Sequence, residues 1–295
     1  MDPELIATVR RFNRTVTQRV GALDDQYMSR DRPLAQARLL WEIGPDGAEV
    51  AALRARLGLD SGYLSRLLRT LEGDGLVRVG PAGGDGRVRV ATLTAAGRSE
   101  WAELDERSDE LARSILDPLS DRRRERLVAA MAEVERLLVG SMVVVEPCPP
   151  ADPRARASVR AYAREIAQRF DDGFDPALSK PVRDEELVPP AGVFLLATLN
   201  GEPVGCGAVK LHAGAPAEIK RVWVSDGVRG LGVGRRLLDR LERYAAERGW
   251  TAVRLDTNRN LTEAIALYRA AGYQEIAPYN DEPYAHHWFE KRLTP

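Results

Sequence analysis

The chain contains few of the residues that cross-link secreted proteins or bind structural metals. Only two of its 295 residues are cysteines. Cys148 and Cys206 cannot form a disulfide framework, and neither has a metal-like partner nearby in the sequence, so we expect no metal site. No apolar run approaches the roughly 20 residues that cross a membrane. The start, residues 1–4, lacks the basic and apolar parts of a signal peptide. We therefore expect a cytoplasmic protein without a membrane partner.

Lysine is scarce, and the chain has no strong excess of either charge. Four of the 43 basic residues are lysines, and the formal net charge is −1. The overall charge therefore gives no sign of nucleic-acid binding. The distribution is uneven, however, because residues 50–99 hold eight arginines against four acidic residues.

Length and composition indicate two globular domains. The chain is 44% hydrophobic and 29% charged, and four prolines lie between residues 147 and 153. Residues 142–146 before these prolines have the apolar character of a strand, which places the prolines in a strand-to-helix loop. The predicted boundary therefore falls near Gly140, between domains at 1–140 and 141–295.

The first domain is predicted to be mainly helical, with one pair of strands. Apolar residues at helical spacing predict helices over about 5–20 and 34–43, and a short one from Val50 to Leu57 that Gly58 ends. Asp60 or Ser61 is expected to cap the next helix. Strands are expected over 76–79 and 88–92, joined by a turn at 80–86, and two more helices over about 95–116 and 120–139. Two short helices followed by two strands are typical of a winged helix-turn-helix.

In such a domain the second short helix enters the major groove of DNA and the strand pair contacts the backbone or the minor groove. Hydroxyl and guanidinium groups suit phosphates and base edges. The exposed face of that helix is expected to carry Ser61, Tyr63, Ser65, Arg66 and Arg69.

Three spaced motifs resemble the MarR family of bacterial regulators. They are Leu71-Glu72-x-x-Gly75-Leu76-Val77, Asp85-Gly86-Arg87 and Leu93-Thr94-x-x-Gly97-Arg98. The resemblance implies that Arg87 contacts DNA from the strand pair. It also implies a homodimer formed by the helices at about 2–22 and 95–139, bound to a double-stranded operator. A winged helix that binds protein instead of DNA remains the alternative.

The second domain is predicted to be α/β with a mixed, mostly antiparallel central sheet. Asn200-Gly201 has the composition of a hairpin turn. Helices are expected over about 152–170, 235–248 and 261–271, and strands over 142–146, 193–199, 203–211, 217–224, 251–256, 273–277 and 285–292.

A glycine-rich segment lies between one of these strands and a helix. Residues 229–234 read Arg-Gly-Leu-Gly-Val-Gly, and such a turn lets backbone N–H groups converge on a phosphate at the positive end of the helix dipole. The segment resembles the acetyl-CoA pyrophosphate loop of the GNAT acetyltransferases, Arg/Gln-x-x-Gly-x-Gly/Ala. The resemblance implies that acetyl-CoA is the co-substrate and that the loop binds it through Arg229, Gly230, Leu231, Gly232, Val233 and Gly234.

Further site residues follow from the same resemblance. The strand before the loop would splay from its neighbour and pair with the pantetheine through Val222, Trp223 and Val224. Residues 264–273 resemble the second family signature, whose tyrosine, Tyr268 here, would protonate the departing thiolate. Asn260 would bond the pantetheine, with Asn258 as a second candidate.

The base and the acceptor are less constrained by the sequence. Glu218 lies eleven residues before the loop motif, where some GNAT enzymes hold a glutamate that accepts the amine proton. A strand-end charge paired with Lys220 or Arg221 is the alternative for Glu218. Acceptor contacts are expected from residues 170–175 and 279–288, where aromatic and acidic residues would suit a cationic amine with an apolar body. His286 and His287, on a strand, would point to opposite faces and so would not share a metal.

The sequence therefore predicts a DNA-binding regulator fused to an N-acetyltransferase that moves acetyl to an amine by direct attack. This amine is unidentified and belongs either to a small molecule or to a peptide or protein lysine. One alternative is a regulator whose second domain senses acetyl-CoA or a metabolite without catalysis. Another is an acetyltransferase whose helical domain only dimerises.

Overall fold

A computed structural model describes residues 2–22, 32–82, 85–171, 173–180 and 182–293, without the side chains of residues 85–87. The chain divides into two compact units, Met1–Met131 and Ala132–Pro295. The helix α6 (Asp121–Met142) contains both this division and the predicted boundary near Gly140, which stays a prediction. No helix in the described ranges is long and apolar enough to span a membrane.

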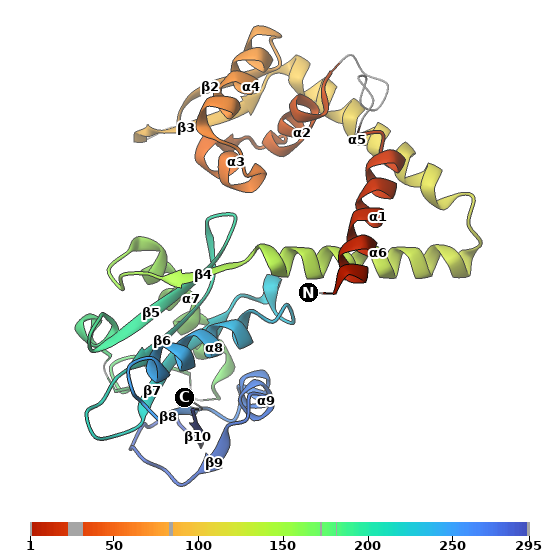
Figure 1. Cartoon of the computed structure of the whole chain (residues 1–295). Coiled ribbons are helices and arrows are strands. Elements are labelled where there is room, and N and C mark those ends of the chain that lie inside the picture. Colours follow the sequence, from red (N-terminus) through yellow and green to blue (C-terminus); the bar gives the residue numbers. More distant parts are fainter. Residues whose placement is uncertain (1, 23–31, 83–84, 172, 181, 294–295) are drawn as a thin grey trace. The chain divides into compact units, whose positions relative to one another are not determined.

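The first unit holds the predicted winged helix-turn-helix (Figure 1). Asp60 caps α4, and its carboxylate accepts the backbone N–H of Tyr63 at 2.8 Å. Gly58 ends α3 in the left-handed conformation. Before α6 the elements are α1 (Pro3–Arg19), α2 (Leu34–Ile43), β1 (Ala48–Glu49), α3 (Val50–Leu57), α4 (Ser61–Gly73), β2 (Val77–Ala82), β3 (Asp85–Leu93) and α5 (Ala95–Leu116).

Two details differ from the sequence prediction. The strand pair extends into the predicted turn at 80–86, because β2 runs to Ala82 and β3 already begins at Asp85. A further two-residue strand, β1, pairs with β3 to give a sheet of order β1-β3-β2. Such a short strand has no periodicity of its own and arises from tertiary contact with Ala91 and Val90.

The core of this unit lies between α2, α4, α5 and the small sheet. The four leucines of α4 at 64, 67, 68 and 71 are buried, and they pack with Leu39, Leu40 and Leu53. Burying these leucines leaves the polar face of α4 exposed. By contrast, α1 has no buried residue within this chain.

The second unit is built on a seven-stranded sheet of order β4-β5-β6-β7-β8-β10-β9, in which β7 and β8 pair in parallel and the other neighbours are antiparallel. The Asn200-Gly201 hairpin is present, with φ of 52° and 84° at the two residues. The strands are β4 (Val144–Pro147), β5 (Gly192–Leu199), β6 (Glu202–Lys210), β7 (Ala217–Val224), β8 (Ala252–Thr257), β9 (Gln274–Ile276) and β10 (His287–Arg292).

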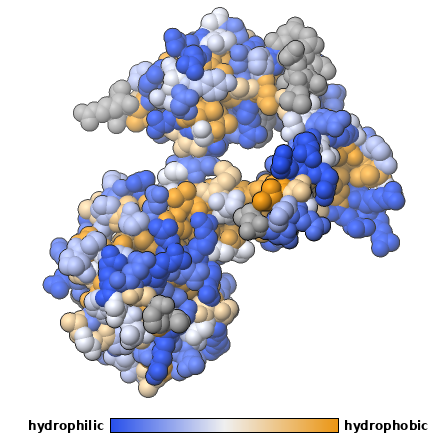
Figure 2. All heavy atoms as spheres, in the orientation of Figure 1, coloured by the Kyte–Doolittle hydropathy of each residue, from blue (hydrophilic) through white to orange (hydrophobic). Residues whose placement is uncertain are grey.

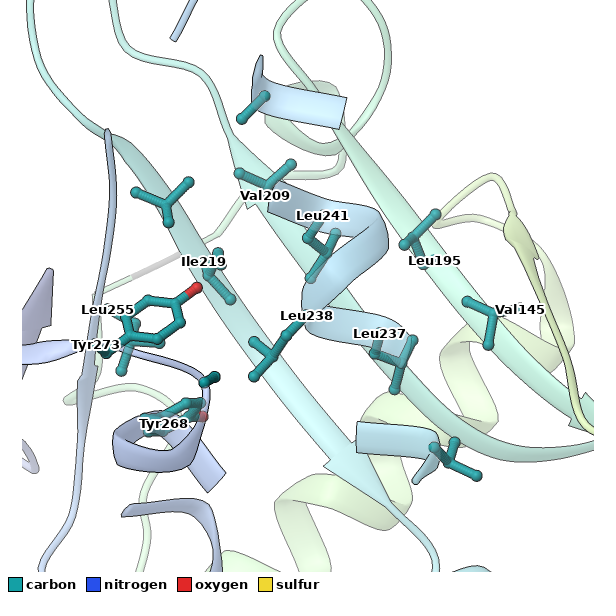
Figure 3. Close-up of a cluster of buried hydrophobic side chains, with 14 of the residues drawn as sticks. Val145, Leu195, Val209, Ile219, Leu237, Leu238, Leu241, Leu255, Tyr268 and Tyr273 are labelled. Carbon is teal, nitrogen blue, oxygen red and sulfur yellow. The ribbon is translucent and has the colours of Figure 1, made fainter. Parts of the chain in front are cut away.

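Three α-helices accompany this sheet in the described residues: α7 (Pro153–Arg169), α8 (Val233–Ala246) and α9 (Thr262–Ala270). Two 3-10 turns also lie here, η2 (Asp184–Leu187) and η3 (Asp226–Val228). The alternation of side chains along β5 divides the core. Leu195 faces the leucines of α8 (Figure 3). Phe194 and Leu196 instead belong to a separate cluster with Ala155 of α7. The two helices therefore cover opposite faces of the sheet.

His286 was predicted to lie in the last strand, but β10 begins one residue later, at His287. The His287 ring lies 2.6 Å from the Glu275 carboxylate on the neighbouring strand. Among the described residues no group of three or more His, Cys, Asp or Glu side chains could hold a metal ion.

Candidate active site

The site begins where β7 and β8 separate. The two strands pair only at Ala217 with Val253 and at Glu218 with Arg254. From Ile219 onward, β7 keeps its partner β6 on one side but has no paired strand on the other. The predicted splay is therefore present, and it leaves Val222 to Val224 without a strand partner on the side facing β8; the Val224 carbonyl instead accepts Arg229 Nε at 3.0 Å.

Two adjoining cavities lie along this opening. The first, here called the loop cavity, has a volume of about 470 Å³ and is lined by the end of β7, the glycine loop and α9. The second, here called the sheet cavity, has a volume of about 300 Å³ and is lined by β7, β8 and α7. Six residues line both, which shows that the cavities meet: Tyr162, Ile166, Val222, Leu261, Ala264 and Tyr268.

The glycine loop presents free backbone donors to the loop cavity. Gly230 and Gly232 have φ of 76° and 75°, which disfavours any residue with a Cβ. The N–H of Arg229 donates to Asp226, and the first N–H bonded within α8 is that of Arg236. The N–H groups of residues 230–235 therefore have no acceptor in the described part of the chain. Together with the α8 dipole, they form a site suited to a phosphate.

The third glycine is required for packing instead. A Cβ on Gly234 would lie 3.0 Å from Leu267 Cδ2, so the absence of a side chain lets α8 approach α9 closely. Leu231 does not line the cavity and lies next to Gly140 in the last turn of α6, where a Cβ would lie 3.0 Å from that of Leu231. Arg236 bonds the carbonyl oxygens of Gly140 and Val143. This end of α6 therefore supports the loop.

Glu165 on α7 organises the loop from its other side, a role that the sequence analysis missed. Its carboxylate accepts Arg229 Nη2 at 2.5 and 2.6 Å, Trp223 Nε1 at 2.8 Å and Arg169 Nη1 at 3.1 Å. Burial raises the pKa of Glu165, but these donors outweigh burial and leave the pKa lowered. The Arg229 guanidinium is thus held by protein at the lining of the loop cavity, and its part in cofactor binding stays a prediction. The one signal in the sequence was the i, i+4 pair with Arg169.

Tyr268 lies where the two cavities meet. Its side chain is 6% exposed and packs against Tyr273 and Phe289. Among the described residues, the hydroxyl has no hydrogen-bond partner. Burial is the main cause that raises its pKa, so the phenol stays protonated at neutral pH. A protonated hydroxyl at this place can donate a proton to a departing thiolate.

Tyr162, which the sequence analysis also missed, is the second tyrosine at this junction. It projects from α7, and burial is the main cause that raises its pKa as well. Helical spacing alone does not distinguish such a residue from a core tyrosine, and only the tertiary structure brings it beside Tyr268.

Glu218 does not line either cavity. Its carboxylate accepts Lys220 and Tyr279 at 3.1 Å each and lies 3.2 Å from His212. Burial raises the pKa of Glu218, but Lys220 and the hydrogen bonds outweigh burial and leave the pKa lowered. Lys220 also pairs with Asp256 at 2.6 Å, and both of these residues line the sheet cavity. The predicted base therefore belongs to a network whose cavity-facing carboxylate is Asp256.

The Asn260 side chain forms hydrogen bonds with other protein groups, and Asn260 does not line either cavity. Its side-chain amide donates to the Arg169 carbonyl at 2.8 Å and to Asp171 at 3.1 Å, which connects α7 to the loop before α9. Asn258, the second candidate, lines the sheet cavity and donates to the Tyr284 carbonyl at 2.9 Å.

Of the predicted DNA-contacting residues of α4, Ser61, Arg66 and Arg69 are exposed, whereas Tyr63 and Ser65 are half-buried and Tyr63 packs against the core. Arg66 lies over the Tyr63 ring at 5.6 Å, and Arg69 Nε donates to the Ser65 carbonyl within the helix. Arg66 and Arg69 are exposed and form no ion pair among the described residues, and Ser61 is exposed beside them. The Arg87 side chain lies outside the described residues.

Comparison with known proteins agrees with these features. The GNAT acetyltransferase family matches residues 160–273, and the MarR family matches residues 30–88. The IAA acetyltransferase of Azospirillum brasilense is 39% identical over 124 residues, which cover 40% of this chain and 81% of that protein. An uncharacterized N-acetyltransferase of Schizosaccharomyces pombe is 33% identical over 128 residues, which cover 42% and 77%.

Among solved structures, an acyl-CoA N-acyltransferase from Klebsiella pneumoniae is 30% identical, with a TM-score of 0.42, over 52% of this chain and 99% of that one. The family matches and the relatives establish the resemblance seen in the sequence. The chain therefore belongs to the GNAT acetyltransferase family and joins this enzyme domain to a MarR family domain.

Proposed function

We propose that the second domain transfers acetyl from acetyl-CoA to an amine by direct attack, and that the first binds double-stranded DNA as a homodimer. The observation that carries the enzymatic part is that two cavities meet at Tyr268. Only the loop cavity is lined by the glycine loop, whose backbone N–H groups are free. Acetyl-CoA fits the loop cavity because its pyrophosphate matches those donors, and when bound it supplies the activated acetyl group.

The protein groups then have separate tasks. The loop N–H groups hold the pyrophosphate, and the backbone of Val222 to Val224, which has no partner strand on the β8 side, orients the pantetheine and polarises the thioester carbonyl. As the amine nitrogen forms its bond to the acetyl carbon and the C–S bond breaks, Tyr268 gives its proton to the sulfur. The amine loses a proton to a carboxylate. Glu218 is the proposed base, and Asp256 is the second candidate because it reaches the sheet cavity.

The test is CoA release from acetyl-CoA across polyamines, aminoglycosides, amino acids and lysine peptides. Tyr268→Phe should lower kcat by about 100-fold, with little change in acetyl-CoA affinity. Tyr162→Phe is the matched control, since it removes a hydroxyl at the same junction. A larger loss from Tyr162→Phe would transfer the acid role to Tyr162. The base is identified by measuring kcat/KM against pH for Glu218→Gln and for Asp256→Asn. The variant whose profile loses its acidic limb is the one that lacks the base.

Tight acetyl-CoA binding without turnover of any amine would contradict the enzymatic proposal. That result would favour the ligand-sensing regulator, which needs the loop but neither an acid nor a base.

The DNA-binding part rests on the exposed arginines of α4 and on the MarR family match. The homodimer rests on α1, whose apolar residues are exposed in the single chain. Leu5, Ile6, Val9, Phe12 and Val16 are between 40% and 62% exposed. A stripe of this kind is typical of a helix that packs against a second chain.

A further inference from the structure

The sheet cavity has an excess of positive charge that the general reaction does not require. Basic side chains at its lining are Arg160, Lys180, Lys220 and Arg221, and the acidic ones are Asp256 and Glu282. Phe170, Phe174, Tyr284 and Glu282, from the two segments expected to contact a cationic amine with an apolar body, also line this cavity, and the basic side chains are an addition to them.

Both lysines of the cavity lining form ion pairs with protein carboxylates. Lys220 is held between Asp256 and Glu218, at 2.6 and 3.1 Å. Lys180 pairs with Asp281 outside the cavity lining. These lysine charges are therefore already balanced by protein carboxylates.

The charges of the two arginines, by contrast, are not balanced by protein carboxylates. Neither Arg160 nor Arg221 lies within ion-pair distance of a carboxylate among the residues that the structure describes. Arg221 donates from Nη2 to the Val182 carbonyl at 3.2 Å, which orients the guanidinium and leaves its other N–H groups available. A planar guanidinium with free donors suits a carboxylate, which it can bind through two parallel hydrogen bonds.

The backbone at Arg221 indicates that its position is specific. Arg221 has φ of 56°, the left-handed conformation that non-glycine residues rarely adopt. It lies where the β6–β7 register shifts between Cys206 and Ala208, so β7 carries a bulge at this point. Bulges redirect side chains and occur beside active sites. Here the bulge places Arg221 at the cavity next to Val222, which lines both cavities.

An apolar surface completes the sheet cavity. Phe170, Phe174 and Tyr284 line it, and their ring centroids lie between 5.0 and 6.0 Å apart. Such a cluster suits the flat or bulky side group of a small molecule better than the flexible chain of a lysine.

We propose that the acceptor is an amine that also carries a carboxylate and a large apolar group, as in an aromatic α-amino acid. Arg221, with Arg160, binds the carboxylate, and the aromatic cluster holds the side group. Asp256, across the opening on β8, lies on the same cavity to receive the ammonium. This inference rests on the proposed acetyl transfer and adds the substrate class.

The test compares acceptors that differ only in the carboxylate: phenylalanine against phenethylamine, and tryptophan against tryptamine. In the wild type, kcat/KM should favour each amino acid over its amine by about 100-fold, because the amine leaves the arginines unpaired. In Arg221→Gln this ratio should fall toward one, while Arg221→Lys keeps an intermediate ratio. Arg164→Gln, an exposed arginine of α7 outside the cavity lining, should leave the ratio unchanged.

A ratio near one in the wild type, or a ratio that Arg221→Gln leaves unchanged, would overturn the inference. Absence of turnover for every amine would instead contradict the proposed acetyl transfer. In that case calorimetric titration of the CoA-loaded protein with phenylalanine and phenethylamine still decides the inference. Binding of phenylalanine that Arg221→Gln abolishes supports it, and equal binding, or no binding, of the two compounds overturns it.

Discussion

At the scale of single residues, the glycines of the loop separate two physical roles. Gly230 and Gly232 are required by backbone conformation, since both have positive φ and a Cβ at either would meet nothing within 4 Å. Gly234 is required by packing against Leu267. The sequence motif showed three equivalent glycines, and only the structure distinguishes them.

Gly232→Ala should weaken acetyl-CoA binding by about tenfold, because a strained left-handed alanine costs on the order of 1 kcal/mol or more and would relax by moving the donors. Isothermal titration with CoA measures the effect. Gly249→Ala is the matched control, since Gly249 has φ of 89°, also has an open Cβ direction and does not line the loop cavity. Equal affinities for both variants would show that the loop backbone does not hold the pyrophosphate.

The same scale explains which site residues could be predicted. Tyr268 and the loop glycines lie in contiguous motifs, so their neighbours in sequence identify them. Glu165 could not be found in this way, because its partners Trp223 and Arg229 are 58 and 64 residues away. Glu218 was visible by its spacing, but its contacts with Lys220, Tyr279 and His212 come from three different segments.

At the scale of elements, α4 combines a buried apolar face with an exposed face that carries arginines. Leu64, Leu67, Leu68 and Leu71 anchor the helix in the core, which keeps its arginines on the surface. A helix held in this way can present Arg66 and Arg69 to DNA without a change in its own structure.

Arg69→Ala should weaken binding to double-stranded DNA and reduce the slope of log K against log salt by about one, as expected for the loss of one phosphate contact. Fluorescence anisotropy over a salt series measures both quantities. Arg113→Ala, in the last turn of α5, removes the same charge from the same unit and should leave the slope unchanged. If the two variants behave alike, α4 does not carry the contact.

Elements also differ in how well the sequence determined their ends. The caps of α3 and α4 were predictable, since Gly58 and Asp60 act through local backbone conformation and a local hydrogen bond. The length of the β2–β3 pair was not, because pairing between strands extended both of them into residues with turn composition.

At the scale of the whole molecule, α1 and α6 carry apolar residues that neither core buries. Val128 and Met131 of α6 are 49% and 52% exposed, and Val9 of α1 is 58% exposed. Figure 2 shows apolar residues interrupting the hydrophilic surface along these helices. Burial of such residues in a second chain contributes roughly 25 cal/mol per Å² of apolar surface.

Val9→Glu should convert the expected dimer to a monomer, because a carboxylate in the apolar stripe would have to lose its hydration in the interface. Light scattering coupled to size-exclusion chromatography measures the mass. Leu178→Glu is the control. Leu178 is 64% exposed, and it belongs to the second unit and to neither α1 nor α6. A monomeric wild type would contradict the dimer directly.

The sequence by itself determined the two domain types, the order of the main elements, the glycine loop and Tyr268. Each depends on local conformation, on periodicity or on residues close together in the chain. Only the tertiary structure decided the environment of these residues. The hydrogen bonds that Glu165 accepts from the loop, the network around Glu218 and the position of Arg221 all require segments distant in the sequence to meet. Charge balance and cavity shape are sums over such contacts, and no single segment contains them.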